Sequence, residues 1–247
     1  EMVLEAGGRL QSMGIVALND MSEALRQVKG LAAAGHVGVL VGSNVNGKSI
    51  ASPDFHPFLA ACEEQGLLVF CHGIKPTGLE RLGGPGMMQA IIGIPHENSM
   101  AIASFIATDI LGKFPRLRLA FSHGGGGISA VIDRMNLVWS KFDIMRGSCD
   151  VSPNEYARRF YYDTSVFGRD YLSYLAKQFG ARQLLAGTDG PAEFSERDIQ
   201  AFVTGTGLSS DEVAQIIGGN MVDLLALLKQ DREERQSRRR FSQSVME

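Results

Sequence analysis

The sequence predicts an α/β protein built on a parallel β-sheet, and three observations carry this prediction. Short apolar runs alternate with segments of helical periodicity six times along the chain. The apolar runs are nearly continuous, which is typical of strands in a parallel sheet with helices on both faces. The chain has 247 residues, 45% of them hydrophobic, which is enough for one large core or two small ones.

The number of strands leaves two architectures open. A (β/α)8 barrel has eight strand–helix units in about 250 residues. Because six strands are visible, the chain folds either as an open, doubly wound sheet or as a TIM-type barrel without its first two units.

The elements follow one another in a regular order. Asn19 and Asp20 precede a helix as capping residues, and Gly66 follows another helix as a plausible C-cap. Strands are expected over 14–18, 37–42, 67–71, 117–122, 160–164 and 183–187. Helices are expected over 21–34, 57–65, 98–111, 128–146 and 170–179, with two more after the last strand. A long loop rich in Gly and Pro is expected over 73–96.

The end of the chain differs in composition from the rest. Residues 1–228 are expected to form the barrel domain, and residues 229–247 a charged tail without an apolar stripe. Such a tail is expected to be a solvated helix or disordered. Acidic residues interleave with its arginines, which argues against a nucleic-acid role.

Composition and charge exclude several classes of protein. The formal net charge of −3 and the pI near 6.0 give no electrostatic basis for binding nucleic acid or an anionic membrane. No apolar run approaches the ~20 residues of a membrane helix, and no signal peptide is visible. The three cysteines are scattered, which indicates reduced thiols in a cytoplasmic protein. A chain that opens on Glu also indicates that its true beginning is missing.

Three ionisable residues each stand at the end of a predicted strand. His72 ends Val-Phe-Cys-His-Gly, His123 precedes four glycines, and Asp189 lies in Gly-Thr-Asp-Gly-Pro. Loops at the carboxyl ends of parallel strands converge on one face, so these side chains predict an incomplete site for a divalent metal. Taken singly, His72 could be a hydrogen-bonded structural residue, and Asp189 could be a cap or turn residue.

The glycines after His123 allow two interpretations. Without side chains, residues 124–127 let a substrate or a backbone segment approach closely. Alternatively they form a tight turn into the next helix, whose N-terminus could bind an anion. The G-x-G-x-x-G spacing of dinucleotide-binding proteins, with its acidic residue, is absent.

Segment by segment, the chain resembles the amidohydrolase-related (amidohydrolase 2) family typified by aminocarboxymuconate-semialdehyde decarboxylase and the γ-resorcylate-type decarboxylases. The resemblance covers about residues 14–227. It rests on Ser-Asn-Val-Asn-Gly at 43–47, Pro-Asp-Phe-His-Pro at 53–57, Val-Phe-Cys-His-Gly at 69–73, Gly-Ile-Pro-His-Glu at 93–97, Lys-Phe-Pro-Arg-Leu at 113–117, Ser-His-Gly-Gly-Gly at 122–126, Tyr-Tyr-Asp at 161–163 and Gly-Thr-Asp-Gly-Pro at 187–191.

The resemblance implies a distorted (β/α)8 barrel with one divalent metal, most often zinc and sometimes manganese. By position, His72 and Asp189 match metal ligands, and Asp189 also counts among the catalytic residues. His123 matches a histidine that acts as an acid and base. Arg134 matches an arginine that, in some members, holds a substrate carboxylate in the neighbouring subunit, so a homodimer is expected.

The chain departs from the family pattern in two places. The family's first strand supplies a His-x-His or Glu-x-His pair, and nothing before Gly14 contains one, so the first two units are expected to be absent. Gly190 replaces a bulkier residue and should widen the pocket. The expected activity is removal of CO2 from a small carboxylated aromatic or muconate-type compound. The alternatives are hydrolysis or hydration by the same residues, and a non-catalytic truncated remnant.

Overall fold

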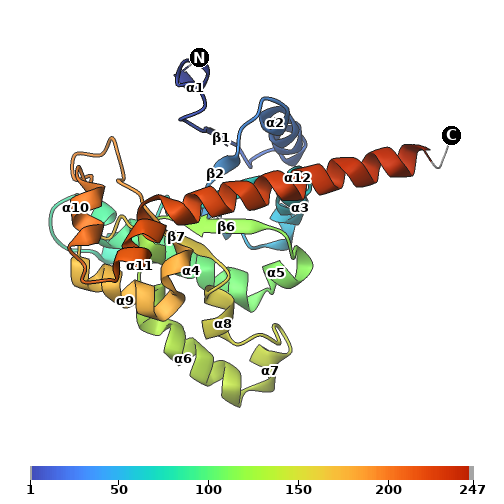
Figure 1. The fold of residues 1–247 in the computed structure, drawn as a ribbon. Coiled ribbons are helices and arrows are strands. Elements are labelled where there is room, and N and C mark those ends of the chain that lie inside the picture. Colours follow the sequence, from blue (N-terminus) through green and yellow to red (C-terminus); the bar gives the residue numbers. More distant parts are fainter. Residues whose placement is uncertain (1, 245–247) are drawn as a thin grey trace.

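A six-stranded parallel sheet forms the centre of the protein in the computed structural model, which describes residues 2–244 (Figure 1). Its strands are β1 (Met13–Ile15), β2 (Gly38–Gly42), β5 (Leu68–His72), β6 (Arg118–Phe121), β7 (Tyr161–Asp163) and β8 (Leu184–Leu185). They pair in the order in which they occur along the chain, all parallel. In a barrel the strands pair in the order of the chain, whereas in a doubly wound sheet the strand order reverses at a switch point. The α/β barrel-type prediction is confirmed.

Helices follow the strands, with the two predicted caps in place. Asp20 accepts a hydrogen bond from the backbone of Glu23, and Gly66 adopts the left-handed conformation (φ 61°). The helices are α1 (Met2–Glu5), α2 (Met21–Ala33), α3 (His56–Gln65), α4 (Ile94–Ala107), α5 (Ile110–Lys113), α6 (Ile128–Lys141), α7 (Asp143–Arg146), α8 (Pro153–Ala157), α9 (Arg169–Phe179), α10 (Ile199–Thr204), α11 (Ser210–Ala214) and α12 (Asn220–Ser244). Strands β3 (Asn44–Val45) and β4 (Lys48–Ser49) form a small hairpin beside the sheet.

The two faces of the sheet are covered unequally. The larger core joins one face to helices α2, α3, α4, α6 and α9. On the other face lies α12, which crosses the sheet (Figure 1). Its Leu224 and Leu228 pack against Leu68, Ala120 and Leu185. Helices therefore cover both faces, as predicted, but most of them lie on one, because strands that follow one another in order place their crossover helices on one side.

The edges of the sheet are β1 and β8, which each pair with one neighbour in the described part of the chain. Ile15 on β1 is 78% exposed. Both edges offer backbone groups to a further strand.

Several predicted helices are interrupted. Asp109, with φ at 48°, separates α4 from α5, and Phe142 adopts an extended conformation between α6 and α7. Helix α8 was not predicted from the sequence, although Ser152 caps it and Pro153 occupies its first turn.

Helix α12 continues through the predicted charged tail as far as residue 244. Arg232 donates hydrogen bonds to the carbonyl oxygens of Gly66 (3.1 Å) and His36 (2.8 Å). Asp231 lies 3.5 Å from Arg118 in an ion pair. This part of the tail is packed, contrary to the expectation of a solvated segment, and the domain boundary at residue 228 stays a prediction. No helix among residues 2–244 is long and apolar enough to span a membrane.

We expect the three cysteines to be unreactive in the folded protein. Cys62, Cys71 and Cys149 are free and buried, and burial raises the pKa of each thiol, that of Cys71 to about 12. At pH 8, ~10⁻⁴ of the Cys71 thiol would be ionised. Titration with a disulfide reagent should detect no thiol within minutes in buffer and three in guanidinium. Rapid labelling in buffer would contradict the described packing.

Candidate metal centre

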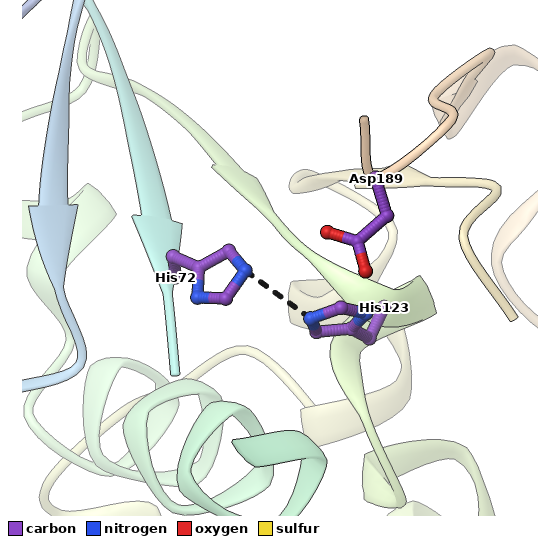
Figure 2. Close-up of side chains that lie close together, drawn as sticks. All are labelled: His72, His123 and Asp189. Carbon is purple, nitrogen blue, oxygen red and sulfur yellow. Dashed lines mark hydrogen bonds between the residues drawn. The ribbon is translucent and has the colours of Figure 1, made fainter. Parts of the chain in front are cut away.

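His72, His123 and Asp189 lie together at the carboxyl ends of the strands (Figure 2). His72 is the last residue of β5, His123 follows β6 after Ser122, and Asp189 lies in the loop after β8. One ligand atom of each lies within 4.8 Å of the other two, and all three side chains are half-buried. The predicted convergence of these side chains at one edge is confirmed.

The two imidazole rings face each other through their Nε2 atoms. These atoms lie 3.2 Å apart, and the rings are inclined at 76°. The Nδ1 atom of His72 lies 2.9 Å from the carbonyl oxygen of Gly73, and that of His123 lies 3.4 Å from the carbonyl oxygen of Ser165. A carbonyl oxygen only accepts hydrogen bonds, so each Nδ1 carries the hydrogen in these contacts.

Two neutral rings in this tautomer direct both Nε2 lone pairs at the same point. Such an arrangement is repulsive unless a cation lies there or one ring carries a second proton. Ligands around zinc at ~2.0–2.2 Å in tetrahedral geometry stand about 3.3–3.6 Å apart, close to the observed 3.2 Å. Metal-bound histidines also commonly donate their other N–H to a backbone carbonyl. Together with the Asp189 carboxylate, these donors fit a divalent metal.

Both His123 and Asp189 have left-handed backbone conformations. Their φ angles are 54° and 58°, which cost a residue other than glycine about 1–3 kcal/mol. Strain of this kind persists only where the surrounding structure determines the conformation, and it is common at functional sites.

The glycine loop after His123 determines that conformation through close packing. A Cβ on Gly126 would lie 1.8 Å from the carbonyl oxygen of Pro95, and one on Gly124 would lie 2.6 Å from Leu175. Gly124 and Gly126 also have positive φ angles. The missing side chains therefore leave room for the protein's own backbone and side chains, in agreement with the turn interpretation. Of residues 124–127, Gly126 lines the cavity described below.

Asp163, at the end of β7, is a buried carboxylate whose role the sequence analysis missed. Its Oδ1 accepts hydrogen bonds from the backbone N–H groups of Gly124 (3.2 Å) and Ser165 (3.0 Å). Burial raises the pKa of Asp163, and the nearby His123 opposes this increase. Since Gly124 follows His123 and Ser165 supplies its carbonyl partner, Asp163 fixes both segments that orient the His123 ring.

We expect Asp163→Ala to lower the free energy of unfolding by about 2–5 kcal/mol, because it leaves two buried N–H groups without an acceptor. Asp163→Asn retains an acceptor oxygen and is the matched control, with a smaller loss. Urea denaturation of both variants measures the difference. Equal stability of the alanine and asparagine variants would show that the two hydrogen bonds contribute little.

Glu97 provides a second buried carboxylate, on the first turn of α4. It accepts hydrogen bonds from Ser43 Oγ (3.1 Å), Asn44 Nδ2 (2.9 Å) and the N–H of Thr77 (3.1 Å). The N–H of Ser43 in turn donates to the carbonyl oxygen of His72 (2.9 Å). This network joins the end of β2 to the segment that follows the candidate ligand His72.

A cavity of about 490 Å³ opens beside the His-His-Asp cluster. Its lining residues come from the loops after β5, β6, β7 and β8 and from α4 and α9. They are Met87, Ala90, Ile91, Pro95, His123, Gly126, Ser165, Val166, Phe167, Tyr171 and Phe194. Because His123 belongs to both the cluster and the cavity lining, it can contact a molecule bound there.

Arg134 lies apart from this chain's own cluster. It is exposed on α6 and makes no hydrogen bond or ion pair within residues 2–244. The other histidines are also outside the cluster. His36 bonds to Ser12 at the opposite end of β2, His56 packs against Phe114, and His96 is exposed on α4.

The strand order and the His-His-Asp cluster define an α/β protein of the barrel class with a candidate metal site at its strand ends. The chain belongs to the amidohydrolase family, since the family model Amidohydro_2, described as Amidohydrolase, matches residues 1–227. A relative, 2-amino-3-carboxymuconate-6-semialdehyde decarboxylase from Dictyostelium discoideum, is 26% identical over 230 residues. That match covers 92% of this chain and 64% of the relative. The chain thus spans less than two thirds of that protein.

Solved structures of decarboxylases share the fold. The 5-carboxyvanillate decarboxylase of Sphingomonas paucimobilis superposes with a TM-score of 0.81 at 25% identity, over 91% of this chain and 69% of that one. A dihydroxybenzoic acid decarboxylase from Polaromonas sp. JS666, with bound manganese and an inhibitor, gives a TM-score of 0.80 at 20% identity. This match covers 91% of this chain and 71% of that one.

Proposed function

We propose that the protein is a metal-dependent decarboxylase that removes CO2 from a small carboxylated aromatic or muconate-type compound. The observation that carries the proposal is the pair of imidazole Nε2 atoms 3.2 Å apart, with the Asp189 carboxylate beside them. This donor set calls for a cation at the edge of a cavity of small-molecule size. The relatives named above, which are decarboxylases, support the reaction class.

The residues have separate tasks in this proposal. His72 and Asp189 would hold the metal, which when bound would supply positive charge to stabilise the negative charge that develops on the substrate. The bond between the substrate and its carboxylate breaks, CO2 leaves, and the electron pair remains on carbon. His123 delivers a proton to that carbon, and general acids of this kind contribute ~10²–10⁴-fold to the rate. His123 then regains a proton from solvent.

The metal is zinc or manganese in this proposal, with zinc first because imidazole and carboxylate ligands suit it. Manganese is the alternative, since the dihydroxybenzoic acid decarboxylase binds it. Measuring CO2 release by the chain loaded with zinc and by the chain loaded with manganese decides between the two metals.

Measurement of CO2 release tests the function directly. The metal-loaded chain is incubated with panels of carboxylated phenols and muconates, and both CO2 and the remaining product are quantified. The proposal expects one CO2 for each product that has lost its carboxylate. Hydrolysed or hydrated products without CO2 would establish the alternative reaction, and no product from any compound would indicate a non-catalytic remnant.

We also propose that the protein forms a homodimer in which Arg134 serves the neighbouring site. Arg134 is exposed on α6 between Val131 (48% exposed) and Val138 (36%), one helical turn away on each side. A guanidinium pairs well with a carboxylate, and the apolar neighbours favour burial against a second copy. The cytoplasmic location expected from reduced cysteines accords with three free thiols and stays a prediction.

Subunit mixing tests the role of Arg134. We expect Arg134→Ala and His123→Ala each to be nearly inactive alone. A reassociated mixture should recover about a quarter of the original activity, because half the dimers are mixed and each of these contains one intact site. No recovery in a mixture proven to exchange subunits would contradict action across the interface.

A further inference from the structure

The cavity beside the His-His-Asp cluster has an acid–base side chain, that of His123, at the end next to the cluster. Its other walls carry the side chains of Met87, Ile91, Val166, Phe167 and Phe194, all of them apolar. Within the part of the chain that the structure describes, no Lys, Arg, Asp or Glu side chain lines it. Within one subunit, ionic groups of a ligand therefore find partners only at the end formed by His123 and the adjacent cluster, and the Arg134 proposed to come from a neighbouring subunit serves the same carboxylate.

The remaining polar groups of the lining are few, and the most prominent one is engaged. The Tyr171 hydroxyl lies 2.8 Å from the carbonyl oxygen of Gly126, to which it donates, and 2.8 Å from Ser129 Oγ. Tyr171 thus presents mainly its ring to the cavity. A carboxylate placed against these walls would lose its hydration without gaining a hydrogen-bond donor, which is costly.

Two aromatic residues at the cavity are arranged for contact with a flat ring. Phe167 and Phe194 are each 48% exposed, and their rings meet edge to face with centroids 6.1 Å apart. Phe167 also has a φ angle of 58°, an unusual conformation for a bulky side chain. Strain at such a residue is typical of sites that bind a ligand.

We propose, building on the proposed function, that the substrate is an aromatic compound with a single carboxylate and an apolar ring substituent. The carboxylate lies toward His123 and the metal ligands, and the substituent packs against Ile91, Phe167 and Phe194. Compounds with a second carboxylate at the far side of the ring, and acyclic dicarboxylates of the muconate type, are excluded by the apolar walls.

Calorimetric titration of the full 247-residue chain, loaded with zinc, tests this specificity without requiring turnover. The probes are 3-ethylbenzoate, benzene-1,3-dicarboxylate and muconate, of which the first two differ mainly in the second ring substituent. We expect 3-ethylbenzoate to bind with a Kd at least tenfold below that of either dicarboxylate. Equal or tighter binding of a dicarboxylate, or no binding of 3-ethylbenzoate at millimolar concentration, would overturn the proposal.

Charge introduced into the far wall should reverse the preference. Ile91→Arg and Phe194→Arg change side chains that are 58% and 48% exposed, so both variants should fold. Each is expected to tighten binding of benzene-1,3-dicarboxylate at least tenfold and to weaken that of 3-ethylbenzoate. Val222→Arg, at a 65% exposed position of α12 outside the cavity lining, is the matched control and should change neither. An equal effect of the control would show that net charge, not the cavity, governs binding.

The two proposals fail in different ways. Selective binding of 3-ethylbenzoate by a chain that releases no CO2 from any compound would overturn the decarboxylase function alone. CO2 release from dicarboxylates as fast as from aromatic monocarboxylates would overturn the specificity alone.

Discussion

Replacing either His72 or Asp189 by alanine is expected to remove the bound divalent metal and to abolish turnover at the same time. Changes to residues that only support a metal ligand cost about 10–100-fold in affinity, so the loss of a ligand should cost at least ~100-fold. In the proposal His72 and Asp189 are the two metal ligands of the His-His-Asp cluster, so either replacement leaves one of them. The wild-type chain should therefore retain more metal than either variant at every free metal concentration.

Competition with a chromophoric chelator measures the affinity, and elemental analysis after dialysis measures the content. His36→Ala is the matched control, because His36 lies at the opposite end of β2, where it bonds to Ser12. Its metal content should equal that of the wild type. Wild-type content in the His72→Ala variant would exclude His72 as a ligand.

Local patterns were sufficient to predict the arrangement of the cluster. His72 ends an apolar strand, and His123 and Asp189 lie in the loops that directly follow two others. Parallel strands in sequential order bring their carboxyl ends to one edge. The strand order itself was not readable from the sequence, because an open doubly wound sheet has the same alternation of strands and helices. The distinction depends on which strands pair, and pairing is a long-range property.

The residues that support the His-His-Asp cluster could not be predicted from local sequence patterns. Asp163 and Glu97 were visible only as members of motifs, and nothing local shows that they are buried or which donors they meet. Glu97 bonds to Ser43, 54 positions earlier in the chain, and Asp163 bonds to Gly124, 39 positions earlier. A buried carboxylate requires such donors, so their positions follow only from the assembled fold.

Local sequence patterns also misled the prediction of a solvated tail and of two continuous helices. The charges of residues 231–235 indicate a solvated helix when read alone, but Arg232 meets two backbone carbonyl groups, at Gly66 and His36. The breaks at Asp109 and Phe142 lie within otherwise helical patterns. At Asp109 the side chain accepts a hydrogen bond from the N–H of Gly112 and caps α5, a local signal that the helical periodicity conceals.

Replacing His123 by alanine is expected to leave the metal content close to that of the wild type while lowering kcat by ~10²–10⁴-fold. His123 is the residue that belongs to both the cluster and the cavity lining, so its imidazole can reach a bound substrate. Its Nδ1 contacts the carbonyl oxygen of Ser165, which Asp163 holds in place, and its Nε2, 3.2 Å from that of His72, is the atom proposed to exchange a proton. A proton donor can be removed without dismantling the metal site, whereas a ligand cannot.

The metal content of His123→Ala separates these roles even where turnover is too slow to measure. The same chelator competition and elemental analysis are used, with His96→Ala as the matched control, because His96 is exposed on α4 and lies outside the cavity lining. That control should match the wild type in both metal content and kcat. If His123→Ala loses its metal as completely as His72→Ala, His123 is a ligand, as the 3.2 Å separation of the Nε2 atoms would also permit. The proton must then come from another group, and reduced kcat in His96→Ala would identify it.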